Sequence, residues 1–174
     1  NAGFYQAYGQ TEASPIITVL DKSRHTFEGP LAGKIQSAGQ AIPGVDIAIF
    51  DDNDQSVANG VVGEICIRGA NVMKGYRNMP EQTSNAIVNQ WLHTGDGGYL
   101  DDEGFVFIVD RVKDMIISGG ENVYSSEVEN AIYQYPNVNQ CAVIGIPSEK
   151  WGEQVHAVVV MNENMTTTEE DIRS

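Results

Sequence analysis

The chain has 174 residues, of which 41% are hydrophobic and 20% are charged, so it contains enough apolar residues for one ordinary domain or two small ones. Its 24 acidic residues outnumber 10 basic ones and give a net charge of −14. This balance argues against nucleic acid and anionic membrane surfaces as partners, because both bind clustered Lys and Arg. No apolar run reaches the length of a membrane span, and no signal peptide is visible.

The two cysteines, Cys66 and Cys141, lie far apart inside apolar runs, which is typical of small buried core residues. They form no CxxC pair, and the histidines show no metal-ligand spacing, so we expect neither a disulfide scaffold nor a zinc site. This cysteine usage favours a reducing, cytoplasmic compartment. Because the chain begins at Asn1 and ends at Ser174 within an expected helix start, we expect it to be cut at both ends.

The first part of the chain is predicted to be rich in β-strands. Residues 1–13 resemble a strand that enters a loop at Gly9, and residues 14–30 an irregular connection. Residues 45–50 and 64–68 follow the patterns of strands, separated by a turn rich in Asp and Asn. Short strands between such turns suggest an antiparallel unit, which we expect to be a distorted barrel.

A short helix is expected near Pro80, since proline suits a first helical turn. Thr83, Ile87 and Trp91 are spaced by four and would share one face of it. Residues 105–110 then alternate as a strand.

After Arg111 the sequence pattern changes from short strands and turns to a helix flanked by strands. Ser126 and Glu129 form a plausible capping box for a helix that Pro136 would stop. The apolar face of this helix has the spacing i, i+3, i+4, i+7 and comprises Val128, Ala131, Ile132 and Tyr135.

Residues 141–144 and 155–160 are predicted to be buried strands, and residues 168–171 the start of a second helix. The fold class is therefore α+β: a β-rich part over residues 1–111 and a small α/β part over residues 112–174.

The pentapeptide Tyr8–Glu12 combines four groups that suit a nucleotide. Its ring can stack on a base, Gly9 permits close approach of the backbone, and the Thr11 hydroxyl can bind a phosphate oxygen. The carboxylate of Glu12 suits Mg²⁺. The same residue types would equally suit a polar turn at the end of a buried strand.

Further polar residues are each open to two interpretations. Asp96 could accept hydrogen bonds from two ribose hydroxyls or cap its own turn, and Arg111 could hold a ribose or phosphate or pair with a neighbouring Asp. Lys113 could be a hinge or a solvated side chain, and Ser118–Gly120 a ligand channel or an ordinary turn. No Ser/His/Asp triad is visible, so a hydrolase has little support.

Five motifs occur in one order along the chain: Tyr8–Glu12, Gly63–Gly69 with Met73–Tyr76, Trp91–Asp96, Asp110–Asp114, and Ser118–Glu129. Together they resemble the adenylate-forming (AMP-binding) enzymes, which include acyl-CoA synthetases, luciferases and adenylation domains of peptide synthetases. Gln10 and the run Ile117–Asn122 are similar to the acyl-CoA synthetase and fatty acid–CoA ligase branch. The resemblance covers essentially the whole chain.

The resemblance implies a role for each residue of the first motif. Tyr8 would flank the adenine, Thr11 would contact the α-phosphate, and Glu12 would bind Mg²⁺. Gly9 and Gln10 would line the acyl and nucleotide pocket.

It also implies roles for later residues. Asp96 would hold the ribose hydroxyls with Arg111 beside them, and Lys113 would be the hinge about which a small domain rotates. The channel for the pantetheine arm of CoA would be lined by Ser118, Gly119 and Gly120.

The implied reaction uses ATP, Mg²⁺, CoA and a carboxylic acid that the sequence does not identify. The acid would form an acyl-adenylate, and CoA would then displace AMP to give a thioester. Residues 1–111 would be the C-terminal part of the large AMP-binding domain, and residues 112–174 an incomplete mobile C-terminal domain.

The family's phosphate loop with its lysine and its C-terminal catalytic lysine are both absent from the sequence. We therefore expect a C-terminal fragment that cannot complete adenylation by itself. There are two alternatives: an adenylation domain that loads a carrier protein, and a non-catalytic nucleotide-binding paralogue. The sequence does not indicate the oligomeric state.

Overall fold

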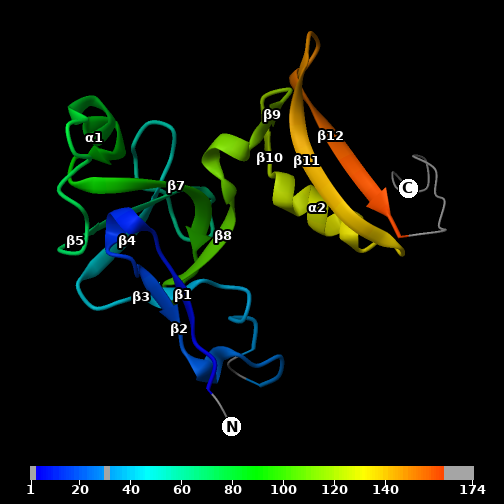
Figure 1. Ribbon diagram of the computed structural model, residues 1–174. Helices are drawn as coiled ribbons and strands as arrows, with labels where there is room; N and C mark the ends of the chain where they lie inside the picture. Colours follow the sequence, from blue (N-terminus) through cyan, green and yellow to red (C-terminus); the bar gives the residue numbers. More distant parts are fainter. Residues whose placement is uncertain (1–2, 30–31, 163–174) are drawn as a thin grey trace. The chain divides into compact units, whose positions relative to one another are not determined.

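The computed structural model describes residues 3–29 and 32–162. The chain forms two compact units, Asn1–Ile108 and Val109–Ser174, so the division falls inside one strand, β8 (Phe105–Arg111). Figure 1 shows strands in both units. Among the described residues, each unit contains one α-helix. The predicted α+β class, with a β-rich first part and a smaller α/β second part, is confirmed.

The first unit is built on an antiparallel sheet in the order β1-β2-β3-β8-β7-β5-β4, with β6 paired to β7. Among the described residues this order is an open path whose end strands β1 and β4 do not pair, so the sheet is antiparallel as predicted, but the expected distorted barrel is wrong. Besides β8, its strands are β1 (Gln6–Tyr8), β2 (Thr18–Leu20), β3 (Gly39–Ala41), β4 (Val45–Phe50), β5 (Gly63–Gly69), β6 (Ile87–Val88) and β7 (Trp91–Leu100).

The core of this unit comes from alternate residues of the central strands. Ile65 and Ile67 of β5 are completely buried, and Asp46 on β4 faces outward, as the alternation predicts. Residues 14–30, expected to be irregular, contain the strand β2, in which Thr18 and Leu20 are completely buried. Three residues are too few for a periodic pattern to reveal a strand.

The helix α1 (Pro80–Ala86) begins at Pro80 as predicted but ends before the expected face is complete. Ile87 lies in β6 and Trp91 in β7. Asn89 and Gln90 connect these strands with positive φ values of 49° and 71°, which suits a two-residue hairpin turn. The predicted helical face through Thr83, Ile87 and Trp91 is therefore wrong.

The second unit has a sheet in the order β10-β9-β12-β11, with α2 packed on it. Its elements are the short 3₁₀ helix η3 (Val112–Asp114), β9 (Ile116–Ser118), β10 (Glu121–Val123), α2 (Ser125–Tyr133), β11 (Val138–Ser148) and β12 (Gly152–Met161). Ile132 of α2 packs with Ile116 and Val143, and Val128 lies against this cluster. The predicted apolar helix face is only partly correct, because Ala131 is exposed and Tyr135 follows the end of α2. Both predicted strands are present as β11 and β12, but the prediction that they are buried is wrong, since Ile144 and Val158 are about half exposed. The helix start expected over residues 168–171 lies outside the described residues.

The N-terminus of α2 is held by Asp110 rather than by the expected capping box. Asp110 Oδ2 accepts hydrogen bonds from Ser125 Oγ (2.7 Å) and from the Ser126 backbone N–H (3.2 Å). Glu129 instead accepts the N–H of Val143. Burial of Asp110 opposes its ionisation, but the hydrogen bonds hold its pKa below the usual value, as suits an anion at a helix N-terminus.

Both cysteines are free thiols: Cys66 is buried and Cys141 is half-buried. Within the described ranges, neither helix has the length and apolar character needed to cross a membrane.

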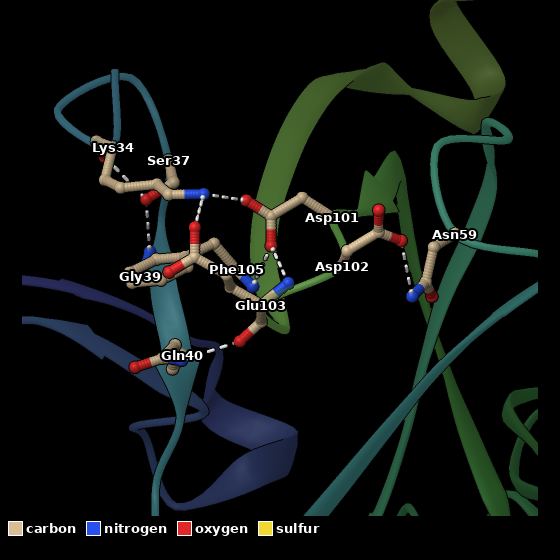
Figure 2. Close-up of polar contacts among 9 residues, drawn as sticks. All are labelled: Lys34, Ser37, Gly39, Gln40, Asn59, Asp101, Asp102, Glu103 and Phe105. Carbon is tan, nitrogen blue, oxygen red and sulfur yellow. Dashed lines mark hydrogen bonds and ion pairs between the residues drawn. The ribbon is translucent and has the colours of Figure 1, made fainter. Parts of the chain in front are cut away.

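A polar cluster fixes the turn between β7 and β8 to the segment before β3 (Figure 2). Lys34 Nζ lies 2.5 Å from Asp101 Oδ2 and 2.8 Å from Glu103 Oε1. The other oxygen of Asp101 accepts the backbone N–H groups of Glu103 and Phe105, each at 2.9 Å. Asp101 thus organises the turn and also pairs with Lys34.

We expect the stabilisation by Asp101 to depend on pH. Partial burial alone would raise its pKa, but the hydrogen bonds from Lys34 and the two amides lower it below the usual value. Since the folded-state pKa is then below the unfolded value of about 3.9, the stabilisation is complete above that pH and is lost as pH falls through the folded-state pKa. In urea denaturation, Asp101→Asn should destabilise the chain at pH 6, and its difference from wild type should shrink towards pH 3. The matched control is Asp102→Asn, an exposed neighbour with one 3.4 Å contact to Asn59, which should change little at either pH.

Candidate active site

Tyr8 and Asp96 lie side by side although 88 positions separate them. Tyr8 ends β1, and its hydroxyl donates a 2.7 Å hydrogen bond to Asp96 Oδ2. Both residues are half-buried. The first unit therefore brings together an aromatic ring and a carboxylate that the sequence singled out separately.

A β-bulge presents Asp96. The pairing of β5 with β7 shifts register between Glu64 and Cys66, and Gly95 has a φ of 76°, which favours glycine. The backbone N–H of Asp96 donates to Thr94 Oγ1 at 3.2 Å. Asp96 thus lies within a strand rather than in the turn that its sequence neighbours also allowed.

Gly9 is required where the loop after β1 passes another segment closely. A Cβ atom at this position would lie 1.7 Å from the carbonyl oxygen of Pro15. The next residue, Gln10, is half-buried and precedes the 3₁₀ helix η1 (Thr11–Ala13), in which Thr11 is exposed and Glu12 is half-buried. The pentapeptide therefore forms a compact turn that leaves the Thr11 side chain accessible.

Tyr76 holds the Glu12 carboxylate, and sequence reasoning did not select it as a site residue. Its hydroxyl donates a 2.9 Å hydrogen bond to Glu12 Oε1 from 64 positions away. The Tyr76 N–H donates to Thr83 Oγ1 (2.9 Å), which fixes this tyrosine to α1. Tyr76 belongs to one of the five motifs, but no local spacing connects it with Glu12.

The segment before Tyr76 also attaches to the loop of η1. The Met73 N–H donates to the Glu12 carbonyl at 2.7 Å, and Asn71 Nδ2 donates to the carbonyls of Ala13 (2.9 Å) and Ile16 (3.3 Å). The backbone and the carboxylate of Glu12 are therefore both fixed from the same segment.

Arg111 and Lys113 lie in the second unit. Arg111 ends β8 and its side chain is exposed; its backbone N–H donates to Asp110 Oδ1 at 2.8 Å. Lys113 is exposed in η3, the short turn between β8 and β9.

Ser118, Gly119 and Gly120 form the hairpin connection between β9 and β10. Gly119 and Gly120 have φ values of 62° and 88°, as the central residues of a type I′ turn do. The Gly119 N–H donates to the Trp151 carbonyl at 2.8 Å, and a Cβ on Gly119 would lie 2.9 Å from the Trp151 ring. Gly119 is thus needed both for its φ and for the close approach of Trp151.

Two models of one family match the chain. The AMP-binding enzyme model matches residues 1–77, and the model of the AMP-binding enzyme C-terminal domain matches residues 127–174. The chain belongs to the AMP-binding enzyme family.

The relatives of this chain include a feruloyl-CoA synthase and a fatty acid ligase. Feruloyl-CoA synthase of Amycolatopsis sp is 47% identical over 90% of this chain and 31% of its own length. A fatty acid–[acyl-carrier-protein] ligase of Streptomyces coeruleorubidus is 42% identical over 90% of this chain and 30% of its own length. The chain spans about a third of the length of such relatives.

Solved AMP-binding enzymes share the fold. O-succinylbenzoate CoA synthetase of Bacillus subtilis, in complex with its acyl-adenylate intermediate, matches 93% of this chain and 32% of its own with a TM-score of 0.81 and 38% identity. The likeness therefore extends across both units of this chain.

Gly9→Ala should destabilise the loop after β1, because the new Cβ meets backbone that cannot rotate away. We expect a loss on the order of 1–3 kcal/mol in the free energy of unfolding, as overpacking typically costs. Gly3→Ala is the control, because the closest contact of its Cβ would be the flexible Lys22 side chain at 3.0 Å, with no backbone atom within 4 Å among the nearest contacts. Equal urea midpoints for the two variants would contradict the close approach at Gly9.

The Tyr76 hydroxyl should ionise at an unusually high pH. Its hydrogen bond to the Glu12 carboxylate, reinforced by burial, raises the pKa of Tyr76 because the proton is shared with an anion. NMR titration of chains with ¹³C-labelled tyrosine, with the signal assigned through Tyr76→Phe, should show this pKa falling in Glu12→Gln. It should stay unchanged in the control Glu81→Gln, an exposed carboxylate on α1.

Proposed function

We propose that this chain is the C-terminal part of an ATP-dependent carboxylic acid–CoA ligase that forms an acyl-adenylate and then a CoA thioester. The contact between Tyr8 and Asp96 is the observation that carries the proposal. A ring and an acceptor-only carboxylate side by side match the two parts of adenosine, since the ring can flank the base and the carboxylate can accept from both ribose hydroxyls. Membership of the AMP-binding enzyme family supports the same assignment.

The loop after β1 would bind the phosphates. Thr11, whose side chain is accessible, would donate to the α-phosphate, while Gly9 and Gln10 would line the pocket. Glu12 fits Mg²⁺, because it offers a hard carboxylate oxygen and its Oε1 is fixed by Tyr76. When bound there, the ion would offset the negative charge of the phosphates.

In the first half-reaction an oxygen of the substrate carboxylate bonds to the α-phosphorus, and the bond from that phosphorus to the bridging oxygen breaks. Pyrophosphate leaves and the acyl-adenylate remains. In the second, the CoA sulfur bonds to the acyl carbon, the bond to the AMP oxygen breaks, and the thiol proton is released. The contribution of Tyr8, Thr11 and Asp96 is to hold the nucleotide in position for both steps.

The second unit would serve the second half-reaction. Lys113, exposed in the short connection η3, would be the hinge, and the turn Ser118–Gly120 would line the pantetheine channel. Arg111 would sit beside the ribose in the assembled enzyme. We assign residues 1–111 to the large AMP-binding domain and residues 112–174 to its mobile C-terminal domain, a boundary close to the division between the two units.

The acid is proposed to be aliphatic or aromatic, since the relatives include a feruloyl-CoA synthase and a fatty acid ligase. A reducing, cytoplasmic location is supported by the two free cysteines. The 174 residues alone are expected not to release pyrophosphate, because the family's two lysines are not among them.

Loading of a carrier protein is the second candidate function. It is favoured by one observation, the 42% identity with a fatty acid–[acyl-carrier-protein] ligase. In that case the thiol that displaces AMP would belong to a protein-bound pantetheine rather than to free CoA.

The test is product formation by the full-length enzyme with ATP, Mg²⁺ and a panel of fatty and aromatic acids. CoA and a pantetheinylated carrier protein are supplied in separate reactions. The proposal expects a CoA thioester with one class of acid. Acylation of the carrier protein alone would favour the second candidate, and no pyrophosphate release with any acid would contradict both.

Asp96→Asn should weaken nucleotide binding in the same enzyme. Replacing the anion removes one acceptor for the ribose hydroxyls, and charged hydrogen bonds contribute roughly 1.5–3 kcal/mol, so KM for ATP should rise by about tenfold or more. Asp102→Asn, on the exposed turn after β7, is the control and should leave KM unchanged. A KM for ATP that does not respond to Asp96→Asn would argue against contact with the ribose.

A further inference from the structure

Glu64 and His93 form a half-buried pair beside the bulge that carries Asp96, and the proposed function gives them no role. Glu64 lies in β5 and His93 in β7. Their side chains are 24% and 14% exposed. Cys66 is the third member of this cluster, and one ligating atom from each of the three residues lies within 4.8 Å of the others.

Both carboxylate oxygens of Glu64 form hydrogen bonds with residues of β7. Oε1 accepts the backbone N–H of Gly95 at 2.9 Å, and Oε2 lies 2.7 Å from Nδ1 of His93. Because a carboxylate only accepts, Nδ1 carries the proton and donates it to Oε2. Glu64 therefore binds the residues on both sides of Thr94, at the point where the register of β5 and β7 shifts.

Thr94 completes this support. Its buried hydroxyl donates to the carbonyl of Ile65 at 2.7 Å and accepts the N–H of Asp96 at 3.2 Å. A bulge leaves a residue outside the regular ladder, so its backbone donors need other acceptors. Glu64 serves the N–H of Gly95, and Thr94 serves the N–H of Asp96.

The contacts favour this supporting role over a metal site. A metal would have to share the two oxygens of Glu64 with the hydrogen bonds that each already accepts. It would also require the thiolate of Cys66, whereas burial, helped by the charge of Glu64, raises the pKa of that thiol.

We propose that Glu64 is a positioning residue for Asp96: by holding the Gly95 amide and the His93 ring, it fixes the bulge in the geometry that presents the Asp96 carboxylate beside Tyr8. The inference rests on the proposed function, in which that carboxylate holds the ribose. Glu64 does not contact the nucleotide. It acts on recognition of the ribose hydroxyls through Asp96.

The test is the preference of the full-length enzyme for ATP over 2′,3′-dideoxy-ATP, which lacks both ribose hydroxyls, measured as two dissociation constants by calorimetry without the acid. Wild type should prefer ATP. In Glu64→Ala the ATP constant should rise by roughly tenfold or more, the effect of at least one charged hydrogen bond, while the 2′,3′-dideoxy-ATP constant changes little. A merely structural defect would weaken both ligands equally and leave the preference intact.

Two further variants keep the test decisive where Glu64→Ala is poorly folded. Thr94→Val should lose the preference and Thr94→Ser should retain it, because only the serine keeps the hydroxyl that accepts the Asp96 N–H. Asp46→Asn, an exposed carboxylate on β4, is the control and should match wild type.

The outcomes separate the two proposals. A wild type that prefers ATP, together with Glu64 and Thr94→Val variants that prefer it equally, overturns the positioning role alone. A wild type that binds no ATP, or binds both nucleotides equally, overturns the proposed role of Asp96 and this inference with it.

Discussion

The hydrogen bond from Tyr8 to Asp96 joins the end of a short strand at the sheet edge to the bulge of a central one. Neither partner could hold this geometry alone. Asp96 is presented because Gly95 has a positive φ and the register of β5 and β7 shifts beside it. Tyr8 is presented because Gly9 lets the following loop pass close to Pro15. Two glycines thus place one ring and one carboxylate in contact.

Hydrogen bonds also fix three further carboxylates of the chain. Glu12 is fixed by Tyr76, Asp110 is fixed at the start of α2, and Glu64 spans two residues of β7. Each of them accepts hydrogen bonds from groups distant in the sequence. The chain has a net charge of −14 and few cations to pair with these carboxylates. Hydrogen bonds from hydroxyl and backbone N–H groups hold them in place instead of opposite charges alone.

Local pattern predicted β4 and β5 well, because their aliphatic residues recur at every second position, as Val45, Ile47 and Ile49 do in β4. It missed β2, whose three residues show no period, and extended α1 over two residues that β6 and β7 use. The association of Tyr8 with Asp96 came from resemblance to a family, not from spacing. The hydrogen bond from Tyr76 to Glu12 and the capping of α2 by Asp110 join residues that are distant in the sequence. No local spacing predicts such contacts.

The most direct test of this account is a double-mutant cycle on AMP affinity in the full-length enzyme, using Tyr8→Phe, Asp96→Asn and the double variant. If the two side chains hold the nucleotide as one hydrogen-bonded unit, the second substitution should cost much less once the first is present. The coupling energy should then be about 0.5–3 kcal/mol. Fully additive losses, or single variants with wild-type affinity for AMP, would contradict the account.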